Sequence, residues 1–386
     1  MQHALLQALS IWPFKGAPDK PEAWLATVAR NRALDLLRSE ARGLLVADEL
    51  VLLAPPSVES EGRFDRELND DELALLFAVC HPSLSVDLRV TFALKTVCGL
   101  TVPQIAAGLL SEPTTIAQRL VRARRQLEAA DVPIEAPSPD ALPERAESVR
   151  TALYLMFNEG YSASSGEVLV QPELCVEAVR LARALAMHPT TMGPASDALA
   201  ALLALTAARL ATRVGPDGVA QLLEDQPREQ WDAGLIALGF DHLARSAAGE
   251  ELTVWHLRAE IASLHALARS TGETDWRRIV AVYDHLVAVD VSPMGRLARA
   301  VALGHAQGAE AGLEAVNACL PSLIDSPYGH AAAATFLIAL RREDDARRHF
   351  ERALAFARTT PERLLMERRL ASLSCGSRSA RSMPPG

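Results

Sequence analysis

The chain has 386 residues, of which 49% are hydrophobic, 23% are charged and only 5% are aromatic. This length predicts two or three domains, and the apolar content is enough to bury a core in each of them. The formal net charge of −9 excludes a protein that coats nucleic acid over its whole surface. Alanine, leucine and arginine are abundant and favour helix over strand, so we predict an all-α fold.

Cysteine usage and hydropathy indicate the compartment. The five cysteines form no CxxC pair, so neither a disulfide framework nor a zinc ribbon is expected. The most apolar stretch, Ala198 to Ala211, is interrupted by Thr206 and Arg209 and is shorter than the roughly 20 residues of a membrane span. No secretory signal follows Met1. We therefore expect a cytoplasmic protein without a membrane partner.

Proline-rich joints and changes of charge divide the chain into parts. In chain order we predict two helices around a Pro-rich turn over residues 1–46, an acidic linker over 47–69, a compact helical block over 70–132, a series of amphipathic helices over 133–373 and a disordered tail over 374–386.

The later helices indicate a repeat. Residues 309–320 and 343–357 are expected to be the second helices of two helical hairpins, with Ala311 matching Ala346 at a spacing of 35 residues. That spacing is close to the roughly 34 residues of a tetratricopeptide (TPR) unit. The pattern predicts a TPR-like domain, with an irregular α-helical bundle as the alternative.

The most informative stretch is residues 101–130. It contains a short helix (101–110), a Ser-Glu-Pro turn and a second helix (114–130), which together predict a helix-turn-helix. At 100° per residue, Ile116, Leu120, Ala123 and Leu127 form one apolar face of the second helix. We expect the opposite face to be purely polar and basic, and we assign DNA binding to Thr114, Thr115, Gln118, Arg119, Arg122 and Arg125.

The charge of this second helix supports the assignment. Four arginines and no acidic residue lie between Thr114 and Gln126, in a chain that is acidic overall. A helix fits the major groove, where arginine pairs with guanine, glutamine with adenine, and threonine contacts phosphate or a thymine methyl group. Loss of Arg119 or Arg122 is therefore expected to impair DNA recognition while the fold survives. The alternative is an ordinary solvated basic helix face.

A second basic helix is predicted over residues 24–38. Its polar side chains, which we also take as candidates for DNA binding, are Arg30, Asn31, Arg32, Asp35 and Arg38. Taken alone, the pattern equally fits a surface helix on which Asp35 pairs with Arg32 or Arg38.

The order of these segments resembles a known family. WLATVARNRALDLLR (24–38), the acidic linker and the helix-turn-helix with RLVRARRQL (119–127) are similar to the sigma-two, linker and sigma-four parts of extracytoplasmic-function (ECF) RNA polymerase sigma factors. Four further segments resemble the subgroup with a C-terminal TPR-like extension. They are LFAVCHPSL (76–84), LYLMFNEGYSAS (153–164), LCVEAVRLARALA (174–186) and LLEDQPREQWD (222–232).

The resemblance implies a transcription-initiation function. Such a protein directs core RNA polymerase to promoter DNA, and its C-terminal domain would bind a regulatory protein. The sigma-two helix (24–38) would contact the minus-ten element, and the sigma-four helix (114–130) would read the minus-thirty-five element. Only residues 3–11 are similar to the end of the helix by which sigma-two domains hold the polymerase clamp. Residues 1–45 are therefore expected to be the least stable part of the fold.

Other readings were weighed against this one. A one-component helix-turn-helix regulator with a peptide- or ligand-sensing repeat domain is the main alternative, and a helical-repeat scaffold is the third. No nucleophile or phosphate-loop signature is present, so we expect neither an enzyme nor a cofactor. Cys80, His81 and Cys98 are expected to pack in a core and not to hold a metal. Truncation after Ala136 is expected to alter transcription without abolishing DNA binding.

Overall fold

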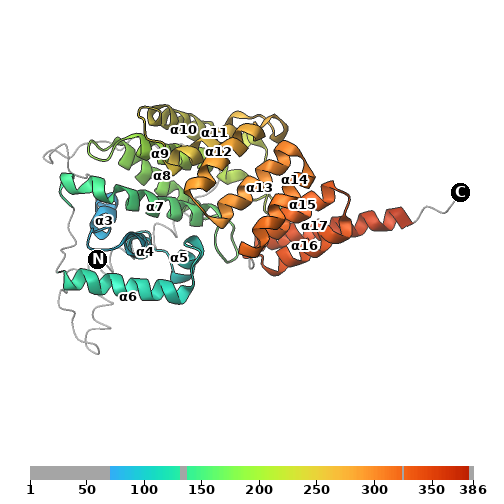
Figure 1. The fold of residues 1–386 in the computed structure, drawn as a ribbon, viewed down its shortest axis with the longest axis horizontal. Helices are drawn as coiled ribbons and strands as arrows, with labels where there is room; N and C mark the ends of the chain where they lie inside the picture. Colours follow the sequence, from blue (N-terminus) through green and yellow to red (C-terminus); the bar gives the residue numbers. More distant parts are fainter. Residues whose placement is uncertain (1–69, 131–136, 324–325, 382–386) are drawn as a thin grey trace. The chain divides into compact units, whose positions relative to one another are not determined.

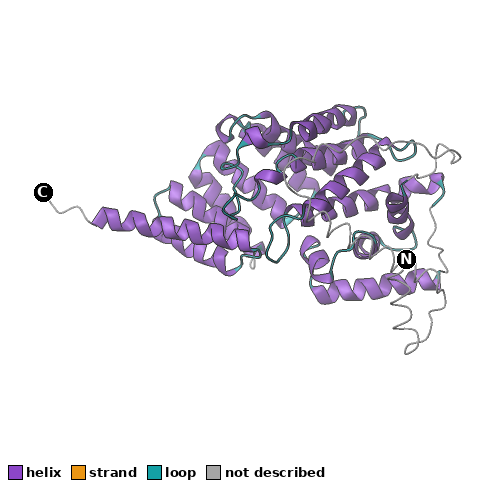
Figure 2. Ribbon diagram, turned by 180° about the vertical axis from the view of Figure 1, so that it is seen from behind, coloured by secondary structure: helices purple, strands orange, loops and turns teal. Residues whose placement is uncertain are grey.

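The computed structural model describes residues 70–130, 137–323 and 326–381. Every regular element in these ranges is a helix (Figures 1 and 2), which confirms the predicted all-α fold. The chain divides into two compact units, residues 1–59 and 60–386, and all the described residues belong to the second. The helices predicted over residues 1–46 and the acidic linker over 47–69 lie outside the described residues.

Four helices form the block predicted over residues 70–132: α3 (Asp71–Val79), α4 (Val86–Thr96), α5 (Val102–Gly108) and α6 (Pro113–Ala129). Leu84, Leu88 and Ala123 form a small core that joins α4 to α6. Cys80 and Cys98 are buried, as the core-packing interpretation predicts. Burial raises the pKa of the Cys80 thiol to about 12, so this group stays protonated at neutral pH.

The next six helices pack around one apolar helix. They are α7 (Leu142–Tyr161), α8 (Pro172–Met187), α9 (Pro194–Ala207), α10 (Ala233–Ser246), α11 (Val254–Leu267) and α12 (Trp276–Val289). Helix α9 contacts α7, α8, α10 and α11. The segment Pro194–Thr212 is long and apolar enough to cross a membrane, yet 78% of it is buried within the protein. Its apolar composition is therefore that of a central core helix.

The last five helices form successive antiparallel hairpins: α13 (Pro293–Gln307), α14 (Ala309–Cys319), α15 (Pro327–Ala339), α16 (Glu343–Ala355) and α17 (Thr360–Arg381). Each packs on the next. Helix α15 begins 34 residues after α13, at Pro327 and Pro293, and α16 begins 34 residues after α14, at Glu343 and Ala309. This spacing agrees with a TPR-like repeat.

The structure corrects two details of this region. The equivalent of Ala346 is Gly312 and not Ala311, because buried residues of α14 and α16 match at a spacing of 34: Gly312 with Ala346, Val316 with Phe350, and Cys319 with Ala353. Residues 374–381, expected to be disordered, continue α17. The prolines that led to that expectation, at positions 384 and 385, follow the end of the helix.

Two glycines allow α13 and α14 to approach closely. A Cβ atom added to Gly312 would lie 2.6 Å from the Cα of Gly304 and 2.7 Å from Cζ of Phe336. Because one of these neighbours is backbone, the helices would have to separate, so we expect Gly312→Ala to destabilise the protein by about 1–3 kcal/mol in urea unfolding. Gly295→Ala in α13 is the control, since its Cβ meets nothing nearer than 3.9 Å. Equal stability of the two variants would contradict this expectation.

Candidate nucleic-acid interface

A tight turn joins α5 to α6 where the sequence predicts it. Thr101 and Gln104 cap α5 reciprocally: the Thr101 N–H donates to Gln104 Oε1 at 2.8 Å, and the Gln104 N–H donates to Thr101 Oγ1 at 3.4 Å. After α5, Leu110 adopts a positive φ of 48°. The N–H of Ser111 then donates to the carbonyl of Ala106 at 2.9 Å, and Pro113 begins α6.

The two faces of α6 largely follow the predicted pattern. Ile116 and Ala123 are fully buried, and Leu120 and Leu127 are partly buried, which confirms the apolar face. Four predicted DNA-binding residues are exposed: Thr114, Gln118, Arg122 and Arg125. The exposed face is not purely polar, however, because Val121 is 51% exposed. Val121 stands 140° from Ile116 around the helix, so it projects outward with the polar residues.

Arg119 does not lie on the outer face. Its Nη2 is 3.5 Å from Oδ2 of Asp87 in the first turn of α4, and its side chain is only 29% exposed. Arg119 is about 60° around the helix from Ile116, which brings it to the edge of the core. The structure therefore corrects the assignment of Arg119 to the face opposite the core. Thr115 is half-buried on the same side.

One exposed arginine of α6 was missed by the sequence assignment. Arg124 is exposed on the flank of the helix away from Arg119. Its signal was present in the sequence, because it is one of the four arginines between Thr114 and Gln126. Its angle of about 80° from Ile116 placed it near the apolar face, but no neighbouring helix covers that flank enough to bury it.

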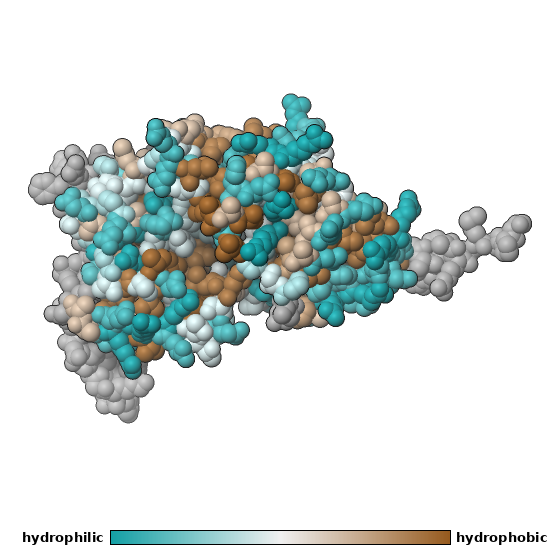
Figure 3. All heavy atoms as spheres, viewed as in Figure 1, coloured by the Kyte–Doolittle hydropathy of each residue, from teal (hydrophilic) through white to brown (hydrophobic). Residues whose placement is uncertain are grey.

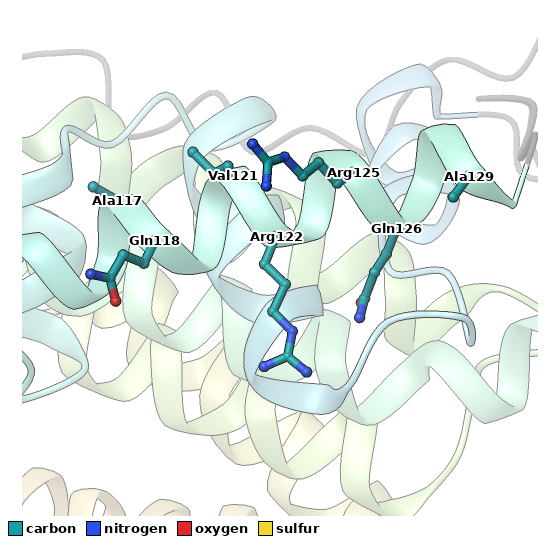
Figure 4. A pocket seen from close by; sticks show the side chains of 7 residues that line it. All are labelled: Ala117, Gln118, Val121, Arg122, Arg125, Gln126 and Ala129. Carbon is teal, nitrogen blue, oxygen red and sulfur yellow. The ribbon is translucent and has the colours of Figure 1, made fainter.

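A surface hollow of about 550 Å³ runs along the outer side of α6. Figure 4 shows that Gln118, Arg122 and Gln126, each four residues apart, project to the same side of the helix. Between them Ala117, Val121 and Ala129 provide apolar surface. The outer side of α6 thus presents a row of amide and guanidinium groups over an apolar floor, which is the donor, acceptor and methyl chemistry that base edges require.

Helix α5 is tied to α7 by a buried carboxyl group. The Nε2 of Gln104 donates to Oε1 of Glu159 at 3.0 Å, and the Ser164 N–H and hydroxyl donate to the same oxygen at 3.2 Å. Burial raises the pKa of Glu159. Next to it, a Cβ on Gly160 would lie 2.8 Å from the Cβ of Leu174. The Asn-Glu-Gly-Tyr segment (158–161) is therefore used for packing between helices.

Helix α3 is held by two arginines from later helices. Arg145 in α7 is buried, and its Nη1 donates to the carbonyl of Phe77 at 2.8 Å in the last turn of α3. At the other end of α3, Arg180 in α8 forms ion pairs with Asp70, with Glu72 at 3.1 Å and with Glu177. The helix-turn-helix block and helices α7 and α8 consequently form one packed assembly.

The remaining candidate residues cannot be placed. Arg30, Asn31, Arg32, Asp35 and Arg38 lie outside the described residues, so the assignment of the helix over 24–38 stays a prediction.

Comparisons with known proteins give a family but no function. Residues 145–247, from within α7 to the end of α10, match a model described as a family of unknown function (DUF6596). An uncharacterized protein from Rhizobium meliloti (strain 1021) is 36% identical over 380 residues, which cover 97% of this chain and 89% of the relative. No solved structure matches the chain significantly. The near full-length similarity shows that the chain belongs to the same family as this Rhizobium meliloti protein.

Proposed function

We propose that this protein is a cytoplasmic sigma factor that binds promoter DNA through the outer side of α6 and brings core RNA polymerase to it. The observation that carries the proposal is the exposed row of Gln118, Arg122 and Gln126, flanked by Arg125, on the second helix of a helix-turn-helix. The resemblance of residues 24–38, of the acidic linker and of residues 119–127 to ECF sigma factors supports the polymerase part of the proposal.

The dimensions and charge of α6 suit the major groove. Seventeen residues make a helix about 25 Å long, and its exposed half carries no carboxylate before Glu128. In this proposal Arg122 forms a bidentate pair with guanine and Gln118 pairs with adenine, while Arg124 and Arg125 contact phosphates. Arg119 has a different role. Its ion pair with Asp87 fixes α6 against α4 and so sets the direction in which the row of polar side chains points.

The acidic balance of the whole chain limits how the protein meets DNA. With a net charge of −9, the surface as a whole repels phosphate, so contact is restricted to basic faces such as α6. Binding should therefore depend on only a few phosphate contacts, and its salt dependence should be correspondingly modest. The helix over 24–38 would contribute the second contact region, on the minus-ten element.

The contact between α5 and α7 favours a second candidate function. Glu159 reaches Gln104 in the first turn of α5, so a ligand that moved α7 would act directly on the helix-turn-helix. This arrangement is what a one-component regulator needs, in which the C-terminal helices sense a peptide or small ligand and no polymerase contact is required.

Two measurements on the full chain separate the candidates. The first is co-purification with core RNA polymerase, and the second is footprinting on DNA selected by the protein from a random pool. A sigma factor should co-purify with polymerase and protect two separated elements. Protection of one element without polymerase would indicate a one-component regulator. Absence of both would leave a helical scaffold and would reject the proposal.

A further inference from the structure

A second hollow, of about 370 Å³, lies between α14, α15 and α16. Its floor is made of leucines from α14 and α15, and hydrophilic side chains gather over α16 (Figure 3). Six charged or titratable side chains line it, one from α15 and five from α16. They are His330, Arg342, Asp345, Arg348, His349 and Arg352. Helix α14 contributes no titratable group to this lining.

The hollow has an excess of positive charge. Asp345 is shared between two arginines: its Oδ2 is 2.6 Å from Nη2 of Arg342, and its Oδ1 pairs with Arg348. Arg352 has no ion-pair partner among the residues that the structure describes. Three guanidinium groups therefore face a single carboxylate, which leaves two uncompensated positive charges before either imidazole is protonated.

The two imidazoles lie against each other. His330 is 7% exposed, and its Nδ1 is 3.1 Å from Nδ1 of His349. Burial, His349 and Arg352 lower the pKa of His330, and burial and Arg352 lower the pKa of His349. Both rings are therefore neutral at pH 7 when the hollow is empty. A bound anion would offset the arginine charges and raise both pKa values, so its binding should take up protons.

A metal cation fits this environment poorly. Two imidazole nitrogens 3.1 Å apart have a spacing compatible with ligands of one metal ion at about 2.0–2.1 Å from each nitrogen. The three arginines repel a divalent cation, however, and the carboxylate of Asp345 is already paired twice. Charge thus selects an anion over a cation.

We propose that this hollow is a binding site for a phosphomonoester dianion, contacted by Arg352, Arg348 and the His330–His349 pair. Guanidinium groups and imidazoles that can gain a proton match a group with two negative charges and three acceptor oxygens. The volume leaves room for the organic part of the ester. The phosphate belongs either to a small molecule or to a phosphorylated side chain. The site is independent of α6, and its proposal does not rest on the function proposed above.

Calorimetric titration of the full chain with inorganic phosphate at about pH 7.5 tests the site. Arg352→Gln should weaken binding at least tenfold. Arg277→Gln removes the same charge from an exposed position of α12 outside the hollow and should leave binding unchanged. Circular dichroism checks that both variants fold. Equal affinities of the two variants, or no binding by the unaltered chain, would overturn the proposal.

Sulfate provides the matching pH experiment, because it keeps two charges across the neutral range. Its affinity should rise severalfold as the pH falls from about 8 to about 6, and His349→Gln should flatten this rise. An unchanged slope in that variant would contradict the role of the imidazole pair. Zn²⁺ binding that depends on His349, without phosphate binding, would reassign the hollow to a cation. Phosphoserine and a phosphoserine peptide then separate the two sources, since the tighter ligand identifies whether the phosphate is free or part of a protein.

Discussion

Replacing Arg122 and Arg125 together by alanine should lower the affinity of the full chain for promoter DNA by about a hundredfold. Both side chains are exposed on the outer side of α6, and neither has an ion-pair partner among the described residues. A base contact of the bidentate type contributes about 1–3 kcal/mol, and loss of a phosphate contact lowers the salt slope by about one. Fluorescence anisotropy at several salt concentrations measures both effects, and urea unfolding should show unchanged stability.

Two single variants make this result specific. Arg277→Ala removes an exposed arginine of α12 and should not affect DNA affinity. Arg119→Ala removes the partner of Asp87 and should reduce affinity less than the double variant, since its guanidinium is already engaged. If Arg119→Ala alone caused the full loss, Arg119 and not Arg122 would be the base-reading residue. If the double variant bound like the unaltered chain, the outer side of α6 would not be the DNA-binding surface.

Arg145→Met should have the largest effect on stability, a loss of about 2–3 kcal/mol. Arg145 supplies a donor to the carbonyls of Phe77 and Ala78, which lie in the last turn of α3 where helical carbonyls lack partners within the helix. Methionine keeps much of the side-chain volume but leaves these buried acceptors without the donor. Its positive charge near the C-terminal end of α3 is lost as well. Urea unfolding of the full chain gives the change in free energy.

Hydrogen exchange locates the effect of Arg145→Met. Amides of α3 and α4 should exchange faster in the variant, while those of α13 to α16 should be unaffected. Arg299→Met is the control, because Arg299 pairs with Asp284 at an exposed position and should contribute less than about 1 kcal/mol. Comparable destabilisation by both variants would show that Arg145 does not serve as a buried cap.

This contact changes how the truncation after Ala136 must be interpreted. Such a chain lacks Arg145, Glu159 and Arg180, and therefore every contact described above that holds α3 and α5 from outside. Weak DNA binding by the truncated chain would then reflect a poorly folded helix-turn-helix and not the loss of a regulatory domain. Arg145→Met in the full chain distinguishes these two explanations, because it weakens the contact while keeping the C-terminal helices.

The features that the sequence predicted well depend on neighbours close in the chain. The apolar face of α6 follows from helical periodicity, and the start of α5 follows from the capping pair Thr101 and Gln104. The hairpins of α13 to α16 were placed by a repeat, with an error of one residue at Gly312. In each case the information lies within one or two helical turns or within one repeat.

The features that it missed depend on contacts between distant residues. Arg119 was placed with the exposed arginines because its spacing resembles theirs, and only the position of Asp87 on α4 turns it toward the core. Arg145 gave no signal at all, since its partners lie 67 and 68 residues earlier in the chain. The polarity of Val121's surroundings was likewise misjudged, because periodicity ranks positions by angle without regard to the residue found there.

The cap that Arg145 places on α3 also defines which part of this protein could be moved into another one. A fusion that carries α3 to α6 alone would leave the end of α3 and the start of α5 without partners, whereas one that continues through α8 would keep Arg145, Glu159 and Arg180. The smallest portable unit containing α6 therefore extends from Asp70 to about Met187. The segment shared with the family of unknown function begins at residue 145, so in this chain its first residue is the one that caps the block before it.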